Sequence, residues 1–382
     1  MGENIPFNKL YSTGTEMQYI QQAIANGKLS SVGYFTRRCQ HLVEKKYNFK
    51  NVLFTNSATD ALEMSALLID IQPNDEVIIP SYTFVSTANA FILRGAKIVF
   101  ADSEAITPNI DTTKIEALIT PRTKAIVCVH YNGVGCNMIE LSALAKKYNL
   151  YIIEDAAQAI NGWFEGSPLG SWGHIATFSF HDTKNISCGE GGMLIVNDSS
   201  LFERAIVIHE KGTNRSAFLS GIINKYEWID IGSSYAPSEL NTAYLLAQLE
   251  QIDQIQVQRN KLWNTYYTLL KPLQDLGFIT IPPDPKLKPN NAHCFYFVCQ
   301  SQQLRDDLID ILKTQKIETH FHYQSLHNST YFHKKHDGRI LGNSDRYSSS
   351  LLRLPLFFEL TTKEVTFICN TIKFHFENTL TY

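Results

Sequence analysis

Lys184 and Asp155 are the two residues whose types and spacing point most directly to chemistry. Lys184 lies in the segment 179–185, just ahead of the glycine-rich run 189–192, and Asp155 closes an earlier apolar run. A lysine amine can form an imine with an aldehyde, and a carboxylate beside a pyridine nitrogen keeps that ring protonated and able to take up carbanion charge. The pair therefore predicts a site for pyridoxal 5'-phosphate, with Lys184 and Asp155 as its catalytic residues.

The residues around Asp155 fit the edge of a sheet. The run 150–153 has the length and β-branched content of a buried parallel strand, so the Asp155 carboxylate is expected at the carboxyl end of that strand. Open α/β sheets bind ligands at that end. Ala156 and Ala157 leave room for a flat ring, and Gln158 can hydrogen-bond a phenolic oxygen. A strand-to-helix turn capped by Asp155 is compatible with this interpretation.

Ser57, Ala58 and Thr59 predict the phosphate end of the same site. They lie between a predicted strand and a predicted helix, where backbone N–H groups and hydroxyls can bind a phosphate. Ser179, just upstream of the lysine, offers a second hydroxyl, and Phe84 in the next strand-to-helix loop can cover one face of the ring. Taken alone, serine and threonine before a helix are common helix caps, and a phenylalanine commonly packs in the core.

The composition restricts the class of protein. At 382 residues the chain is long enough for two domains, which we place at residues 1–250 and 251–382. The net charge of −3 excludes a generally basic surface for nucleic acid, and seven cysteines without a CxxC pair predict reduced thiols and no metal site. Neither a signal peptide nor an apolar stretch of the roughly 18 residues that span a membrane is recognisable. We therefore expect a cytoplasmic protein that binds neither nucleic acid nor membrane.

Strand and helix patterns alternate along the chain as far as Asp155. The predicted strands cover 51–54, 76–79, 96–100, 125–129 and 150–153, and the predicted helices cover 15–26, 36–47, 59–68, 83–94 and 139–148. This alternation predicts an α/β large domain with a mostly parallel sheet between helices. The later patterns predict a strand at 193–196, a helix at 201–210, and a long helical segment at 237–271 in which the domains change. Strands at 294–298 and 319–323 around a helix at 303–315 then predict a smaller carboxy-terminal α+β domain.

Several longer segments carry a family resemblance that runs over nearly the full chain. They are 27–30, 35–39, 80–90, 154–158, 179–181 and 183–185. On these residues the sequence resembles the DegT/StrS-type sugar aminotransferases, which have the fold-type I architecture of pyridoxal-phosphate enzymes. Two further segments, 211–216 and 230–235, make it most similar to the subgroup of dTDP-4-amino-4,6-dideoxygalactose transaminases of enterobacterial-common-antigen type.

The resemblance assigns a role to each cofactor residue. It implies an imine at Lys184, a pyridinium partner at Asp155, and Gln158 near the ring oxygen. It also implies that Ala58 and Thr59, with the adjacent Ser57, hold the phosphate together with Ser179, and that Phe84 stacks on the ring. The phosphate loop departs from the family, because the segment 56–59 replaces the Gly-Thr of many relatives and alanine restricts the backbone.

The resemblance also implies a homodimer with active sites at the interface. The family commonly closes the phosphate site with an asparagine of the neighbouring subunit, and Ser234 stands at that position here. Lys211 and Arg215 would reach over the sugar nucleotide, and the alternative for Arg215 is a surface cation with no ligand. His322, Tyr323 and His327 follow the carboxy-terminal histidine pattern that lines the sugar-nucleotide side, and their simpler interpretation is a polar loop of the small domain.

The expected reaction is a transamination in two halves. L-Glutamate would leave its amino group on the cofactor, which would pass it to C4 of dTDP-4-keto-6-deoxyglucose, a nucleotide-linked 4-keto-6-deoxyhexose, for surface polysaccharide synthesis. Lys184, released from the imine, is the natural base for the proton shift. Amination at C3, the gluco epimer, and a UDP or GDP sugar stay open.

Two other functions are alternatives. A dehydratase of the same fold would carry histidine in place of Lys184, and a regulatory or sensor protein would need an added DNA-binding segment, which the amino-terminal residues do not supply.

Overall fold

A seven-stranded sheet forms the centre of the protein, whose structure is a computed structural model that describes residues 4–379. The strand order is β1-β9-β8-β5-β4-β2-β3. The bounds are β1 (Val52–Thr55), β2 (Glu76–Pro80), β3 (Lys97–Ala101), β4 (Thr123–Val129), β5 (Tyr151–Asp155), β8 (Ile175–Ser179) and β9 (Gly192–Val196). β9 pairs antiparallel with both neighbours, whereas the other pairings are parallel. The predicted mostly parallel α/β sheet is therefore confirmed.

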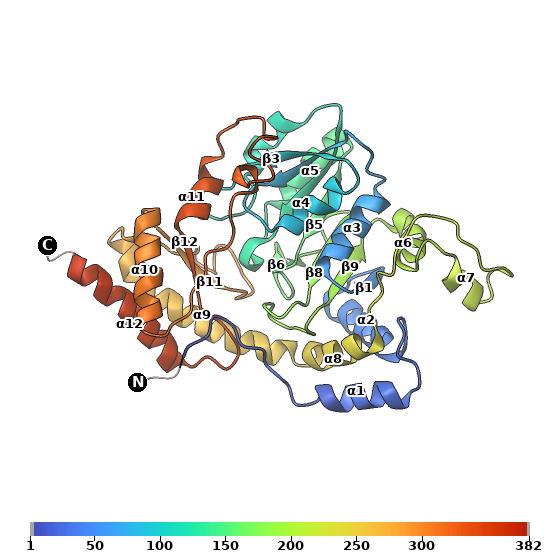
Figure 1. Ribbon diagram of the computed structural model, residues 1–382, viewed down its shortest axis with the longest axis horizontal. Helices are drawn as coiled ribbons and strands as arrows, with labels where there is room; N and C mark the ends of the chain where they lie inside the picture. Colours follow the sequence, from blue (N-terminus) through green and yellow to red (C-terminus); the bar gives the residue numbers. More distant parts are fainter. Residues whose placement is uncertain (1–3, 380–382) are drawn as a thin grey trace.

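Helices cover both faces of this sheet because its strands are apolar on both sides (Figure 1). Side chains such as Val77 and Ile79 pack under α3 (Ala58–Leu68), α4 (Val85–Ile92) and α6 (Phe202–His209). The intervening Ile78 faces the other side, where α2 (Tyr34–Tyr47), α5 (Met138–Tyr148) and α8 (Glu239–Glu250) lie. A two-stranded hairpin of β6 (Trp163–Phe164) and β7 (Ser167–Pro168) follows β5.

The direction of the strands brings distant loops to one edge of the sheet. β5 and β8 are parallel, and β1 has the same direction as β8 because both are antiparallel to β9. Their carboxyl ends therefore lie at the same edge, which places the start of α3, the end of β5 and the loop 180–191 side by side.

The carboxy-terminal part has a three-stranded antiparallel sheet of its own. It consists of β10 (Ile279–Thr280), β11 (Phe295–Cys299) and β12 (Leu351–Leu354), and packs with α9 (Ile252–Asp275), α10 (Gln302–Thr314), α11 (Gly342–Ser350) and α12 (Thr362–Thr379). The predicted strand at 319–323 is wrong. That segment makes one isolated bridge, between His320 and Arg353, because His320 alone exchanges backbone hydrogen bonds with β12.

The predicted helix at 237–271 is two helices, α8 and α9, separated at Gln251. The side chains of α8 and the first turn of α9 pack on the large sheet, whereas Leu262 and later residues of α9 pack on the carboxy-terminal sheet. A domain division near residue 250 stays a proposal, which these separate cores support. Ile5, near the start of the described chain, pairs with Ile317 and packs in the carboxy-terminal core.

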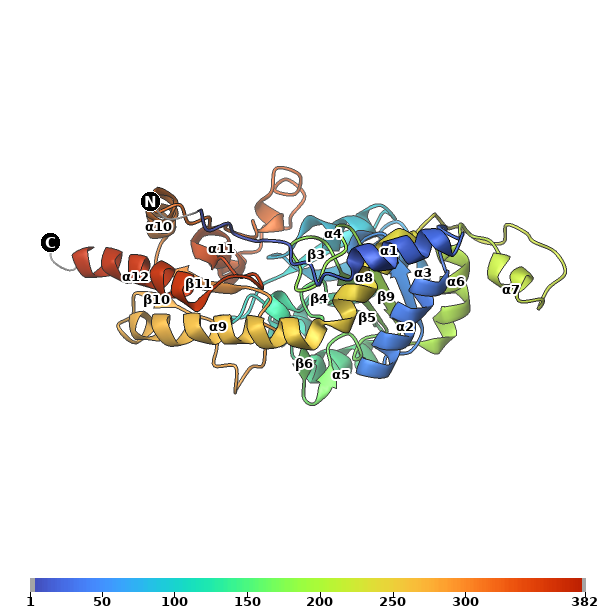
Figure 2. The same cartoon turned by 90° about the horizontal axis from the view of Figure 1, so that it is seen from below.

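A segment of residues 211–234 projects from the body of the protein (Figures 1 and 2). It follows α6, carries the short helix α7 (Arg215–Leu219), and returns to α8. Its exposed apolar side chains include Phe218, Leu219, Ile222, Trp228, Ile229 and Ile231. We call it the projecting segment. The helix α1 (Glu16–Ala25) lies along α8, on the side of α8 that faces away from α2. No helix among residues 4–379 has the length and apolar character needed to cross a membrane.

Candidate active site

A cavity of about 420 Å³ lies at the carboxyl edge of the large sheet, where the carboxy-terminal part closes over it. The predicted residues on its wall are Ser57, Ala58, Thr59, Phe84, Asp155, Gln158, Ser179, Lys184, His322 and Tyr323. These residues come from five separate stretches of the sequence, so the fold brings together what the motifs predicted one by one.

Lys184 is placed by the loop between β8 and β9. Its backbone N–H donates to the carbonyl of His181 at 2.9 Å, which turns the chain so that the side chain enters the cavity. Burial lowers the pKa of the Lys184 amine to about 8; the charge of Asp155 opposes this shift and the charge of Arg353 adds to it. A larger fraction of the amine is therefore neutral near pH 7 than for an exposed lysine, and the neutral amine is the nucleophilic form.

Asp155 ends β5 and is 5% exposed. Its Oδ2 accepts from the Thr87 hydroxyl at 2.8 Å, and its Oδ1 accepts from the Ala157 N–H at 3.2 Å. Burial raises the pKa of the Asp155 carboxyl, and these two hydrogen bonds counteract the rise. A cation placed against the carboxylate would favour its ionised form. The oriented Asp155 carboxylate therefore fits a protonated pyridine nitrogen as its partner.

The start of α3 forms the anion end of the cavity. The Ser57 hydroxyl accepts from the N–H of Asp60 at 3.0 Å, so Ser57 serves as the helix cap. The N–H groups of Ala58 and Thr59 have no hydrogen-bond acceptor among the described residues. The Thr59 hydroxyl bonds that of Ser86 at 2.8 Å, and the Ser179 hydroxyl lies on the same wall. Two free amides at a helix amino terminus, with hydroxyls beside them, fit a phosphate group.

Gly192 allows β9 to pack closely against the start of α3. A Cβ at this position would lie 2.3 Å from the carbonyl carbon of Ser57, a distance no side chain tolerates. The glycine therefore allows β9 to lie directly against the start of α3, where the two free amides of the anion end are.

Gln158 and Phe84 flank the middle of the cavity. The Gln158 Oε1 accepts from the N–H of Asn132 at 2.7 Å, and its Nε2 donates to the Tyr323 hydroxyl at 3.1 Å, so its side chain is oriented. Phe84 is 53% exposed and its ring lies 6.0 Å from that of Tyr323. The alternative that Phe84 packs in the core is therefore excluded.

Four predicted residues lie away from this cavity. Lys211, Arg215 and Ser234 belong to the projecting segment, where Arg215 lies 3.9 Å from Glu210. His327 is buried elsewhere, with its Nδ1 2.6 Å from the Ser81 hydroxyl, and ties the carboxy-terminal part to the loop after β2.

Three residues of the site were not predicted from the sequence: Arg353 and His293, which line the cavity, and Thr87, which donates to Asp155. His293 bonds Asn185, the neighbour of Lys184, at 3.0 Å, and burial keeps the pKa of its imidazole well below the ordinary range. Arg353 gave a signal that went unused: it is the one charged residue in the apolar run 351–357.

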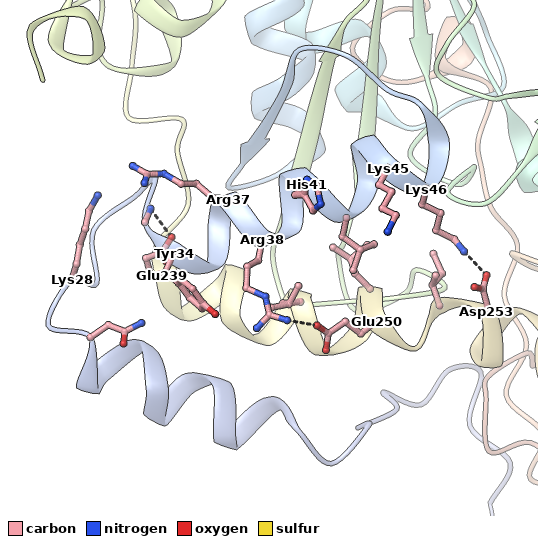
Figure 3. A pocket seen from close by; sticks show the side chains of 16 residues that line it. Lys28, Tyr34, Arg37, Arg38, His41, Lys45, Lys46, Glu239, Glu250 and Asp253 are labelled. Carbon is pink, nitrogen blue, oxygen red and sulfur yellow. Dashed lines mark hydrogen bonds and ion pairs between the residues drawn. The ribbon is translucent and has the colours of Figure 1, made fainter. Parts of the chain in front are cut away.

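A second, larger hollow of about 1170 Å³ lies between α2 and α8 (Figure 3). Lysine and arginine side chains line it, and its carboxylates are engaged, with Glu250 2.7 Å from Arg38 and Asp253 2.5 Å from Lys46. None of the predicted site residues is on its described wall. The chemistry of the motifs therefore belongs to the smaller cavity.

Cys128, His130 and Cys136 also lie together, buried at the end of β4 and in the loop after it, with their ligand atoms within 4.8 Å of one another. The His130 Nε2 lies 2.8 Å from Glu154, and its Nδ1 accepts from the Cys136 N–H at 3.2 Å. Both imidazole nitrogens therefore bond to the protein and hold the loop after β4 in place.

Comparison with known proteins supports the assignment of this cavity as the active site. A model of the DegT/DnrJ/EryC1/StrS aminotransferase family matches residues 11–373. The chain belongs to this family. Membership makes it a sugar aminotransferase that depends on pyridoxal phosphate.

Individual relatives of the DegT/DnrJ/EryC1/StrS family match over almost the whole chain. GDP-perosamine synthase of Escherichia coli O157:H7 is 29% identical over 372 residues, covering 96% of this chain and 97% of that protein. The structure of S. venezuelae DesV has a TM-score of 0.88 at 26% identity, covering 97% of this chain and 98% of DesV. Helicobacter pylori PseC, an aminotransferase involved in the biosynthesis of pseudoaminic acid, has a TM-score of 0.89 at 22% identity, covering 98% and 100%, and shows the shared fold.

Proposed function

We propose that this family member transfers the amino group of L-glutamate to C4 of dTDP-4-keto-6-deoxyglucose and so forms dTDP-4-amino-4,6-dideoxygalactose for surface polysaccharide synthesis. The observation that carries the transamination is the presence of Lys184 and a buried, hydrogen-bonded Asp155 on the wall of one cavity. The choice of sugar rests on the subgroup segments 211–216 and 230–235.

Bound pyridoxal phosphate supplies an aldehyde for the amine and a ring that takes up carbanion charge. The free amides of Ala58 and Thr59, with the Ser179 hydroxyl, would hold its phosphate. Asp155, oriented by Thr87, would keep a proton on the ring nitrogen.

Lys184 would move the proton of the reaction. Its lowered pKa lets the amine accept a proton from the substrate carbon and return it to the neighbouring position within one cavity. Phe84 and Tyr323 would limit the access of water to this proton transfer from the mouth of the cavity.

The proposal includes a homodimer in which the projecting segment acts on the neighbouring subunit. Ser234, Lys211 and Arg215 are exposed and lie off the cavity of their own chain. Trp228, 80% exposed on the same segment, is the kind of apolar side chain that an interface buries. Mixing a Lys184→Ala protomer with an Arg215→Ala, Ser234→Asp protomer should restore activity on subunit exchange, because one site of the mixed dimer then carries neither defect. A mixture that stays inactive after verified exchange would show that both lesions act within one chain.

The reaction is tested with L-[15N]glutamate and the dTDP-linked 4-keto-6-deoxyhexose, followed by NMR of the product. We expect 15N on C4 with the galacto configuration. A label on C3, or the gluco epimer, would overturn the assignment of position or stereochemistry and leave the aminotransferase reaction intact. A GDP-linked 4-keto-6-deoxyhexose forms the second arm, because the relative from Escherichia coli O157:H7 is a GDP-perosamine synthase. Turnover of the GDP sugar alone would contradict the dTDP assignment.

A further inference from the structure

Arg353 is a buried cation without an anionic partner. It lies on β12, lines the cavity and is 6% exposed. Its Nη1 donates to the Nδ1 of His322 at 3.1 Å, and its guanidinium lies over the ring of Phe7 at 5.3 Å. Its Nε has no hydrogen-bond partner, and no described carboxylate lies within 4.0 Å of its guanidinium nitrogens.

The groups around Arg353 do not supply a negative charge to balance its guanidinium. The polar neighbours that act on it are Cys294, Tyr82, Tyr131 and Tyr323. Buried charges in proteins are normally paired, because removing an unpaired ion from water costs several kcal/mol. An arginine fork is shaped for two parallel hydrogen bonds to a carboxylate or a phosphate. The partner of Arg353 is therefore expected to arrive with a ligand.

The position of Arg353 distinguishes between the anions of the two substrates. The guanidinium lies close enough to Lys184 for its charge to lower the pKa of that amine. In an α-amino acid, the carboxylate is attached to the carbon that carries the amine. In a nucleotide sugar, the diphosphate is attached at the anomeric carbon, across the sugar ring from C4. An anion close to the reacting carbon is therefore the α-carboxylate, and the cofactor phosphate belongs to the start of α3.

We propose that Arg353 binds the α-carboxylate of the amino-acid donor through its guanidinium fork, with His322 and Phe7 holding the fork in place. This inference rests on the proposed transamination and concerns its first half alone. It makes Arg353 the residue by which one cavity accepts, in turn, an α-amino acid and the uncharged ring of a nucleotide-linked keto sugar.

The test separates the two half-reactions in the holoenzyme. Loss of the visible absorption of the bound cofactor reports the donor half, with L-glutamate or with 4-aminobutyrate, which is glutamate without its α-carboxylate. Arg353→Met should weaken apparent L-glutamate affinity at least about 30-fold and remove most of the preference for glutamate over 4-aminobutyrate. The reverse sugar half, started with the dTDP-amino sugar, should change less than about 3-fold.

A binding measurement and two further variants complete the test. α-Methyl-L-glutamate has no α-proton to lose, so its titration measures binding alone, and it should show the same loss in Arg353→Met. Arg353→Lys keeps the charge without the fork, so its glutamate affinity should lie between those of wild type and Arg353→Met. This variant also covers the case in which the methionine variant does not fold. Arg305→Met removes another buried arginine, one that is paired with Asp306 outside the cavity, and should leave glutamate affinity unchanged.

Three outcomes have distinct meanings. Glutamate affinity preserved in both Arg353 variants, or a defect in the sugar half alone, would overturn the assignment of Arg353. A wild-type protein that binds pyridoxal phosphate but responds to no α-amino acid would instead overturn the proposed transamination. The predicted pattern, a loss confined to donors that carry an α-carboxylate, supports both.

Discussion

The Lys184 amine should titrate near pH 8 in the cofactor-free protein. Its pKa of about 8, against an ordinary 10.5, makes about one amine in ten neutral at pH 7, compared with about three in ten thousand for an ordinary lysine. The neutral, reactive population is therefore about 300-fold larger. Because the pKa is lowered, this population grows as pH rises through 8 and approaches its maximum near pH 9.

Competitive labelling measures this titration directly. Trace acetic anhydride is added to the cofactor-free protein across a pH series, and peptide mass spectrometry compares the labelling of Lys184 with that of the exposed Lys286. Asp155→Asn removes the charge that opposes the shift, so the midpoint for Lys184 should move further down. Arg353→Met removes a neighbouring positive charge and should move it up.

Two results would exclude this activation of Lys184 by the cavity. A midpoint near 10.5 would mean that the amine is solvated and that the cavity does not activate it. A higher midpoint in Asp155→Asn would mean that the carboxylate does not interact with Lys184 in the way the structure implies.

Three further substitutions test the supports of the site. Thr87→Val removes a hydrogen bond that lowers the pKa of Asp155, so the acid limb of the donor half-reaction's pH profile should move to higher pH; an unchanged limb would exclude this role. Gly192→Ala should displace Ser57 and weaken cofactor affinity more than about tenfold by equilibrium dialysis, and unchanged affinity would contradict the predicted clash. Glu239→Gln disturbs a buried carboxylate that accepts from three amides at the start of α2, and should lower the free energy of unfolding in urea by about 1–3 kcal/mol without changing glutamate affinity.

Local patterns predicted the sheet and one side of the cavity well. A few consecutive residues are enough to predict the strand before Asp155, the helix start at Ala58 and the loop of Lys184. Strand burial and helix capping depend on residues close in sequence. Parallel strands then bring these short signals to one edge. The position of the site therefore follows from the sequence once the sheet is recognised.

The remaining features depend on contacts between distant segments. Thr87 lies within the segment 80–90, but only the fold brings its hydroxyl to Asp155. Arg353 enters the cavity from the carboxy-terminal sheet, and its place in an apolar run does not say which cavity it lines. The pattern over 319–323 was typical of a strand, but a single bridge to β12 leaves it a loop. His327 follows a family pattern, yet its partner Ser81 turns it away from the cavity.

The lysine that holds the cofactor can be identified chemically. Borohydride reduction of the purified holoenzyme fixes pyridoxal phosphate to that lysine, and peptide mapping by mass spectrometry locates the modification. We expect a single modified residue, Lys184, and protection of that residue when L-glutamate is added before reduction. Modification of a different lysine, or of none, would contradict the assignment of this cavity as the active site.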